Sequence, residues 1–316
     1  MTPRRKQSCA IFLLGIVLLS ILPIACGPED YQKSIQQFQD ASNVVINATE
    51  AFLNNMNTIE QNKQLDQTVF EKKPLDLPAL NKVEIISPDE IRLRTGALNA
   101  LAQYTSNLAQ LAQGNAGSGV TASTSQLSTS LQNLAQDAKK LPGPQSSFLN
   151  NPKFSGILSS AASAVGAVAQ LIVEHKARRE IEKSIIDNDA AVTALIQQIS
   201  DDAEGAYLRQ KNQLSEYGVQ LSRDYDLEIR RDPDPVLLLI LAKNIKTYRA
   251  KESQIPAADP SPAIAKMKDA HQALVSYVKS NKSPKNLSEL IATVQDLANA
   301  ASPLGQAIQN LISASL

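Results

Sequence analysis

The chain has 316 residues, and its 31 basic and 31 acidic side chains balance to a formal charge of zero. It holds two Cys, two His and no Trp, and 43% of its residues are hydrophobic. Two cysteines are too few for a zinc finger, a Cys-ligated cluster or a disulfide-stapled fold, and a balanced charge argues against nucleic-acid binding through a basic surface. We therefore expect no metal, no cofactor and no nucleic-acid partner.

The start of the chain differs from the rest. Arg4, Arg5 and Lys6 form a short cationic segment, a mainly apolar run covers residues 10–22, and Cys26 follows the small residue Ala25. The apolar run is shorter than the ~20 residues that a transmembrane helix needs. The layout therefore predicts a secretory signal peptide rather than a lasting membrane span.

A small residue before a cysteine at the end of such a run resembles the lipobox of bacterial lipoproteins. Pro23 stands where that family usually has Leu, and Leu22 lies one position earlier. The resemblance ends at Gly27, and it implies that residues 1–25 are a signal peptide and that Cys26 is acylated as the mature N-terminus. It also implies a body held by its acyl anchor on the exported side of the bacterial envelope, at the outer membrane in a cell with two membranes. Secretion without acylation and an uncleaved anchor remain the alternatives.

Prolines that follow capping residues divide the rest of the chain into helices. Each such pair places an N-cap side chain before a proline at a possible first helical position. The pairs are Ser87-Pro88, Asn151-Pro152, Asp234-Pro235, Ser261-Pro262, Ser283-Pro284 and Ser302-Pro303. Glu90 also completes a capping box with Ser87. Apolar residues at helical spacing between these points predict an all-α fold, an elongated bundle of long coiled-coil-like helices in one domain, residues 26–316.

In chain order, a first amphipathic helix is expected at about 30–62. Residues 63–87 read as an irregular connector that contains Pro74 and Pro78, and only residues 82–87 look like a strand. Helices at 88–113 and from about 119 to 141 are expected to form a hairpin. The stretch 153–231 lacks proline, which predicts a long coiled-coil-like helix with one phase slip near Gly205.

Three further helical segments complete the chain. Residues 235–253 carry the densest apolar run, at 236–242, and are expected at the centre of the core. Residues 262–281 place apolar side chains on one face. These side chains are Ile264, Met267, Ala270, Leu274 and Val278. In the last segment, 284–316, Pro303 is expected to kink or divide the helix.

The most unusual stretch runs from Phe154 to Val173 without a charged residue. Ala162 and Gly166 form a small-xxx-small pair, which permits close helix packing in a membrane or within a bundle. Its many Ser and Ala residues make membrane insertion marginal, so we expect a buried, tightly packed helix, with conditional insertion as the alternative. The order of hairpin, uncharged segment and long helix resembles, in arrangement only, the α-helical pore-forming toxins of the haemolysin E type.

No catalytic constellation is evident. His175 and His271 lack a second metal ligand at a recognised spacing, so surface or interface histidines are expected. Ser276 and Lys279 fit an SxxK pattern whose partner motifs are absent. The sequence thus favours a non-enzymatic lipoprotein that acts as a helical binding or scaffolding protein, with a protein partner or self-association through its helices. A membrane-active protein that uses residues 154–173 is the second hypothesis.

Overall fold

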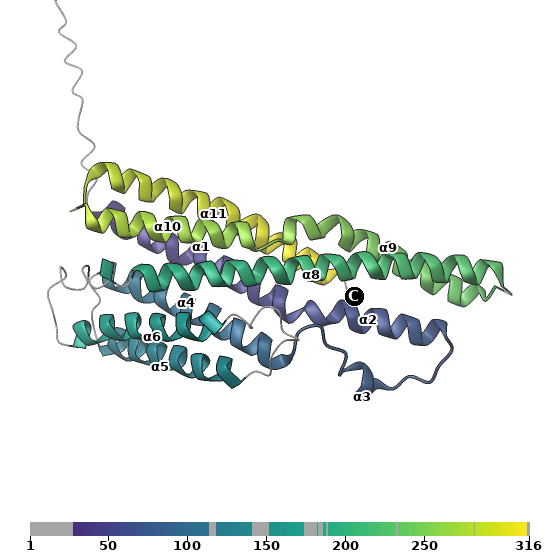
Figure 1. Ribbon diagram of the computed structural model, residues 1–316. Helices are drawn as coiled ribbons and strands as arrows, with labels where there is room; N and C mark the ends of the chain where they lie inside the picture. Colours follow the sequence, from purple (N-terminus) through teal and green to yellow (C-terminus); the bar gives the residue numbers. More distant parts are fainter. Residues whose placement is uncertain are drawn as a thin grey trace, which may run out of the picture.

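The structure is a computed structural model that describes residues 28–113, 118–140, 152–173, 182, 186–187, 189–231, 233–280 and 282–314. These residues form helices joined by turns, and no β-strand occurs among them (Figure 1). The predicted all-α fold is therefore confirmed, whereas coiled-coil packing of the helices stays a prediction.

The helices alternate with short connections. Their bounds are α1 Pro28–Asn54, α2 Met56–Phe70, α3 Leu77–Leu80, α4 Pro88–Ala112, α5 Ser118–Lys140, α6 Pro152–Val173, α8 Asp189–Arg230, α9 Pro235–Gln254, the 3₁₀ helix η1 Ile255–Ala258, α10 Ser261–Lys279 and α11 Pro284–Ser313. With 42 residues, α8 is the longest. At 1.5 Å per residue it extends for about 60 Å.

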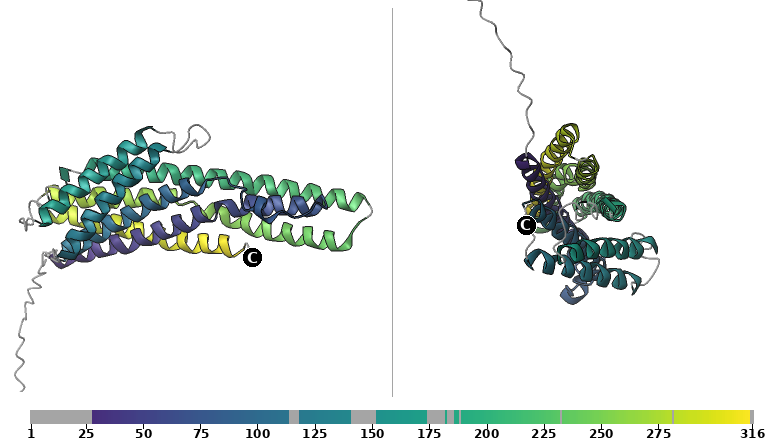
Figure 2. Two further views of the ribbon diagram at one scale, coloured as in Figure 1. Left: turned by 90° about the horizontal axis from the view of Figure 1, so that it is seen from below. Right: turned by 90° about the vertical axis from the view of Figure 1, so that its left-hand side faces the viewer.

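Most of the helices pack into what we call the main bundle, formed by α1, α4, α5, α6, α10, α11 and the first half of α8. Here α1 packs against α4, α10 and α11, while α5 packs against both α4 and α6 (Figures 1 and 2). The largest fully buried side chains come from several of these helices and from the start of α2. They are Phe38, Phe52, Ile35, Ile46, Met56, Ile59, Leu93, Leu98, Leu101, Leu127 and Leu131.

The apolar stripes predicted for the C-terminal helices are confirmed. All five stripe residues of α10 are buried, as are the main apolar residues of α11. However, α11 continues through Pro303, so the expected division of this helix is wrong. Pro303 is exposed, which keeps its ring out of the core. The stripe therefore continues on both sides of the proline, from Leu297 to Leu304.

The predicted helix starts are mostly confirmed. Glu90 N donates to Ser87 Oγ at 3.3 Å and Ser87 N donates to Glu90 Oε2 at 2.9 Å, which completes the capping box. Asp234 Oδ1 accepts hydrogen bonds from the first amides of α9. Ser283 caps α11 in the same way through Asn286 N. Ser302 starts no helix, because it lies inside α11.

The irregular connector expected at 63–87 is shorter than predicted and is interrupted by helical residues. Helix α2 continues to Phe70 after a single turn residue, Asn55, and α3 interrupts the remainder. The strand-like residues 82–87 form irregular structure with a bend at residues 85–86 instead. The side chain of Asn57 explains this, because its Oδ1 accepts from the amides of Ile85 and Ile86 at 2.8 and 3.1 Å. The Asn57 side chain thereby accepts the hydrogen bonds of two backbone amides that would pair with a neighbouring strand in a β-sheet.

Residues 153–231 do not form one unbroken straight helix, because α6 packs alongside α8. Within α8, by contrast, the helix continues through Gly205 and Gly218. The residues on both sides of the predicted phase slip are buried. They are Val192, Ile199, Ala206, Leu214 and Leu221.

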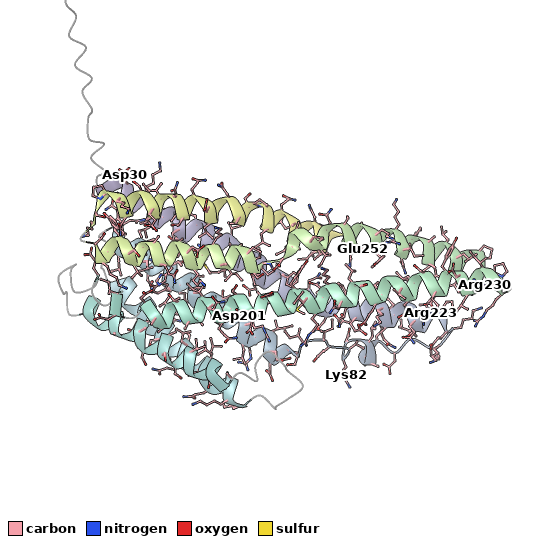
Figure 3. The ribbon with its side chains drawn as sticks, turned by 45° about the horizontal axis from the view of Figure 1, so that its top comes forward. Asp30, Lys82, Asp201, Arg223, Arg230 and Glu252 are labelled. Atoms are coloured by element: carbon pink, nitrogen blue, oxygen red, sulfur yellow. The ribbon has the colours of Figure 1, made fainter. Side chains whose placement is uncertain are left out.

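The remaining helices form what we call the far end, which consists of α2, the second half of α8, and α9. Figure 3 places Asp30, near the start of α1, and Arg230, the last residue of α8, at opposite ends of the molecule. The expectation that α9 lies at the centre of the core is wrong. Val236 and Leu239 are 66% and 57% exposed, because α9 is covered mainly along the side that packs on α8.

Candidate functional site

The predicted lipidation site, Cys26, lies outside the described residues, as does His175. Helix α1 begins at Pro28, two residues after Cys26, at the end of the molecule away from the α8–α9 turn (Figure 3). An acyl group on Cys26 would therefore be joined to this end of the body by a very short link.

The uncharged segment is helix α6. Among its predicted packing residues, Ala162 is fully buried and Gly166 half-buried, while the side chains of Phe154 and Val173 lie outside the described part. Ser128 Oγ of α5 donates to Ala162 O at 2.8 Å, and a Cβ at Gly166 would lie 3.0 Å from the same Oγ. The small residues thus allow α5 and α6 to approach closely. No described helix has the length and hydropathy that a membrane span requires.

His271 is fully buried between helices, so of the two predicted locations, the surface or an interface, it occupies an interface. It lies on the inner face of α10, with its Nε2 3.4 Å from Asp189 Oδ1 and its ring edge-on to Tyr104. The contact with His271 lowers the pKa of Asp189 to about 2. Lys279 Nζ lies 3.4 Å from Asp189 Oδ2, and Ser276 is exposed. The SxxK lysine is therefore engaged in an ion pair with another helix.

A buried ion pair joins α4 to α8 in the main bundle. Arg94 Nε lies 3.7 Å from Asp202 Oδ2, and both side chains are less than 10% exposed. Arg94 also donates to Glu90 O at 3.2 Å. Burial raises the pKa of Asp202 to about 6, although the charge of Arg94 acts in the opposite direction. Because removal of charges from water is costly, such a pair more often fixes geometry than adds stability. The two residues are far apart in sequence, and no local pattern predicts their contact.

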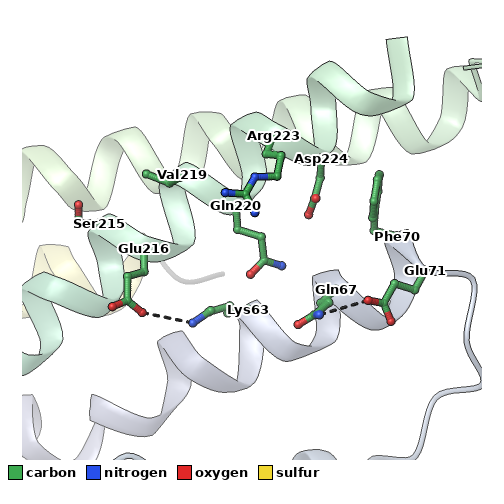
Figure 4. A pocket seen from close by; sticks show the side chains of 10 residues that line it. All are labelled: Lys63, Gln67, Phe70, Glu71, Ser215, Glu216, Val219, Gln220, Arg223 and Asp224. Atoms are coloured by element: carbon green, nitrogen blue, oxygen red, sulfur yellow. Dashed lines mark hydrogen bonds and ion pairs between the residues drawn. The ribbon is translucent and has the colours of Figure 1, made fainter. Parts of the chain in front are cut away.

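At the far end, an open groove of about 500 Å³ lies between α2 and α8 (Figure 4). Charged and amide side chains line most of it. They are Lys63, Gln67, Phe70, Glu71, Ser215, Glu216, Val219, Gln220, Arg223 and Asp224. Lys63 Nζ lies 3.5 Å from Glu216 Oε2 across the groove, and Gln67 donates to Glu71 at 3.2 Å. Lys63, Glu216, Gln67 and Glu71 therefore already have interaction partners within the groove.

A second, smaller cavity of about 200 Å³ lies on the other side of α2, toward α9. Asp66 accepts hydrogen bonds there from Tyr217 Oη and, at 2.8 Å, from Asn244 Nδ2. Lys251 also lines the cavity and is only 4% exposed. Burial raises the pKa of Asp66 and lowers that of Lys251, because both charged forms are taken out of water. We call this the polar cavity.

Neither site is arranged for metal binding. Across the described ranges, no three His, Cys, Asp or Glu side chains gather closely enough to hold a metal ion. No family model, curated protein or solved structure matches the chain.

Proposed function

We propose that this chain is a lipid-anchored protein of the bacterial envelope that binds or spaces other envelope components through its helical body, without enzymatic activity. The observation that carries the binding role is an exposed apolar stripe on α9, made of Val236, Leu239 and Ile240. The i, i+3, i+4 spacing places these side chains on one face of the helix. A cluster of large exposed apolar side chains is typical of an interaction surface.

The start of α1, which follows the proposed anchor in the sequence, and the proposed binding surface lie at opposite ends of the body. Cys26 precedes α1 directly, whereas the α9 stripe begins just after the α8–α9 turn, beside Arg230 (Figure 3). Stable membrane attachment usually requires more than one acyl chain, which lipoprotein-type acylation provides. The body then extends away from its point of attachment and presents α9 at a distance.

Cysteine substitution tests the anchor, and the chain offers a matched control. Cys26→Ser should release the protein from the membrane fraction or leave its precursor uncleaved, because acylation and processing both require that thiol. Cys9→Ser should leave localisation and mature mass unchanged, since Cys9 lies within the predicted signal peptide. The anchor proposal is wrong if Cys26→Ser gives the same fractionation and the same mature mass as the unsubstituted protein.

Site-specific crosslinking in intact cells tests the binding surface. A photoreactive residue at Leu239 should give a discrete crosslinked product, whereas one at Arg249, exposed on the same helix but away from the stripe, should not. The mass of that product distinguishes a partner protein from a second copy of this chain. Equal crosslinking from both positions would show that the stripe has no special role.

The alternative, a membrane-active protein, rests on the uncharged segment. In α6 the residues Leu158, Ala161, Ala162 and Val165 are buried in the bundle, so insertion would require α6 to leave α5 and α8. Dye release from liposomes by full-length Cys26→Ser protein, abolished by Val165→Asp, would favour this function. Retention of the dye would favour the binding role.

A further inference from the structure

The polar cavity opens between two helices that hardly touch. Both α2 and α9 pack along α8, but they make little contact with one another. Eight residues from the three helices line the space between them. They are Asn62, Leu65, Asp66, Tyr217, Asn244, Thr247, Tyr248 and Lys251. Mostly polar side chains therefore occupy a place where three packed helices would normally bury apolar ones.

One side of the cavity presents a fixed carboxylate. Tyr217 from α8 and Asn244 from α9 both donate to Asp66 Oδ2. No described residue donates to Asp66 Oδ1. Since an ionised carboxylate can accept several hydrogen bonds, this oxygen remains available to a donor inside the cavity.

The α9 side of the cavity presents an ammonium group. Lys251 makes no hydrogen bond or ion pair with any residue in the described part of the chain, although it is 4% exposed. The adjacent carboxylate of Glu252 is already held by Tyr248 Oη at 2.9 Å and Arg249 at 2.8 Å. Lys251 is largely removed from water and has no anionic partner among the described residues, which disfavours its charged form, so its place beside a cavity points to an anion that binds there.

The wall of the cavity is formed by a close contact between α8 and α9. A Cβ atom at Gly218 would overlap the ring of Tyr248, so only glycine at this position allows the ring to lie where it does. Tyr248 is buried and lines the cavity next to Lys251. The shape of the cavity thus depends on glycine at position 218, where α8 and α9 touch.

We propose that the polar cavity binds a small zwitterion of the amino-acid class, with its carboxylate on Lys251 and its ammonium on Asp66 Oδ1. Asp66 and Lys251 carry opposite charges on one cavity without forming an ion pair, so a ligand that bears both charges complements them together. The volume, about 200 Å³, suits a molecule of this size. Burial disfavours the charged form of each group, and a bound zwitterion would offset that penalty at both. This binding activity goes beyond the proposed function and does not depend on the lipid anchor.

Calorimetry and thermal unfolding of the full-length protein in detergent test the proposal. The probes are glycine, L-alanine, L-serine and L-glutamine, with acetate and methylammonium as single-charge controls. At least one amino acid should bind and raise the Tm, because a ligand that binds only the folded state stabilises it. Acetate and methylammonium at the same concentration should bind at least 10-fold more weakly. If none of the four amino acids binds, or if a single-charge probe binds equally well, the proposal is wrong.

Substitutions locate the binding. Lys251→Met should weaken the amino-acid affinity by about 30-fold or more, because it removes the cation that would pair with the ligand's carboxylate. The same change should raise the Tm of the unliganded protein, since it removes the unpaired charge. Lys243→Met, an exposed position on the same helix, is the matched control and should change neither value.

Asp66→Asn provides a second, independent variant. The amide keeps an oxygen that can accept from Tyr217, yet it removes the charge that the ligand's ammonium requires. This variant should also bind at least 30-fold more weakly. Unchanged affinity in either folded variant would place the ligand elsewhere and overturn the assignment.

Discussion

Helices α9 and α10 are similar in length, with 20 and 19 residues, yet they differ sharply in how their apolar residues are used. In α10 the five apolar residues of the stripe lie on one face and are all buried, because α1, α8 and α11 pack against α10. In α9 the run 236–242 points in every direction, and packing on α8 covers only part of it. The number of covering helices, rather than the density of apolar residues, therefore decides burial in this molecule.

The main bundle and the far end also differ in whether a buried cation has an anionic partner. In the main bundle, Arg94 of α4 lies next to Asp202 of α8. At the far end, Lys251 has no such partner among the described residues, because the space across from it remains open between α2 and α9. In the main bundle the buried cation Arg94 therefore lies beside a carboxylate from another helix, whereas at the far end Lys251 and the exposed apolar side chains of α9 remain available for binding.

A pair of alanine substitutions should give the largest contrast between the two regions. Phe38→Ala should lower the free energy of unfolding by about 4 kcal/mol, because it removes a fully buried aromatic ring and leaves a cavity. Leu239→Ala should change it by less than about 0.5 kcal/mol, since that side chain is mostly exposed. Urea denaturation measures both. Similar losses in the two variants would mean that α9 is covered in solution and that the contrast is wrong.

A pair of glycine substitutions sharpens the comparison further. Gly156→Ala in α6 should stabilise the protein by about 0.5–1 kcal/mol, because the new methyl group meets open space and alanine favours the helix. Gly218→Ala should instead destabilise it by about 1–3 kcal/mol, since its methyl group would displace the Tyr248 ring.

Thermal unfolding of both variants checks the signs of these effects. If Gly218→Ala were stabilising, the Tyr248 ring would be free to move, and the wall of the polar cavity would not be fixed by this contact.

Much of the fold could be predicted from the sequence, because local patterns carry it. Proline after Ser or Asp marks helix starts such as those at Pro88 and Pro235, and the helical spacing on α10 marks its buried face. Contacts between distant polar residues carry no comparable signal. Nothing near Asn57 in sequence shows that its side chain binds the backbone at residues 85–86.

The polar cavity could not be predicted for the same reason. Its charged residues, Asp66 and Lys251, come from helices far apart in the chain and read individually as ordinary surface residues. The one local signal is Gly218 inside a long helix, where glycine is unfavourable. The structure shows an uninterrupted helix there, in which glycine makes room for Tyr248.

The smallest predicted effect concerns pH and the Arg94–Asp202 pair. Burial raises the pKa of Asp202 from its ordinary 3.8 to about 6 in the folded state. The folded protein therefore holds this proton more tightly than the unfolded chain, and the resulting stabilisation, complete below pH 3.8, is lost as the pH rises through 6. Between pH 7 and pH 5 the wild type should gain about 1 kcal/mol relative to Asp202→Asn, which cannot titrate at this position.

Urea denaturation at pH 7, 6 and 5 measures this gap, with Asp226→Asn, an exposed position on the same helix, as a control that should follow the wild type. A gap that stays constant would mean that Arg94 keeps Asp202 ionised throughout this range, so that the main bundle holds a permanent ion pair. A gap that grows would mean that Arg94 loses its anionic partner below pH 6. In that state the main bundle, like the far end, would contain a buried cation without a counter-charge from Asp202, and the contrast between the two regions would depend on pH.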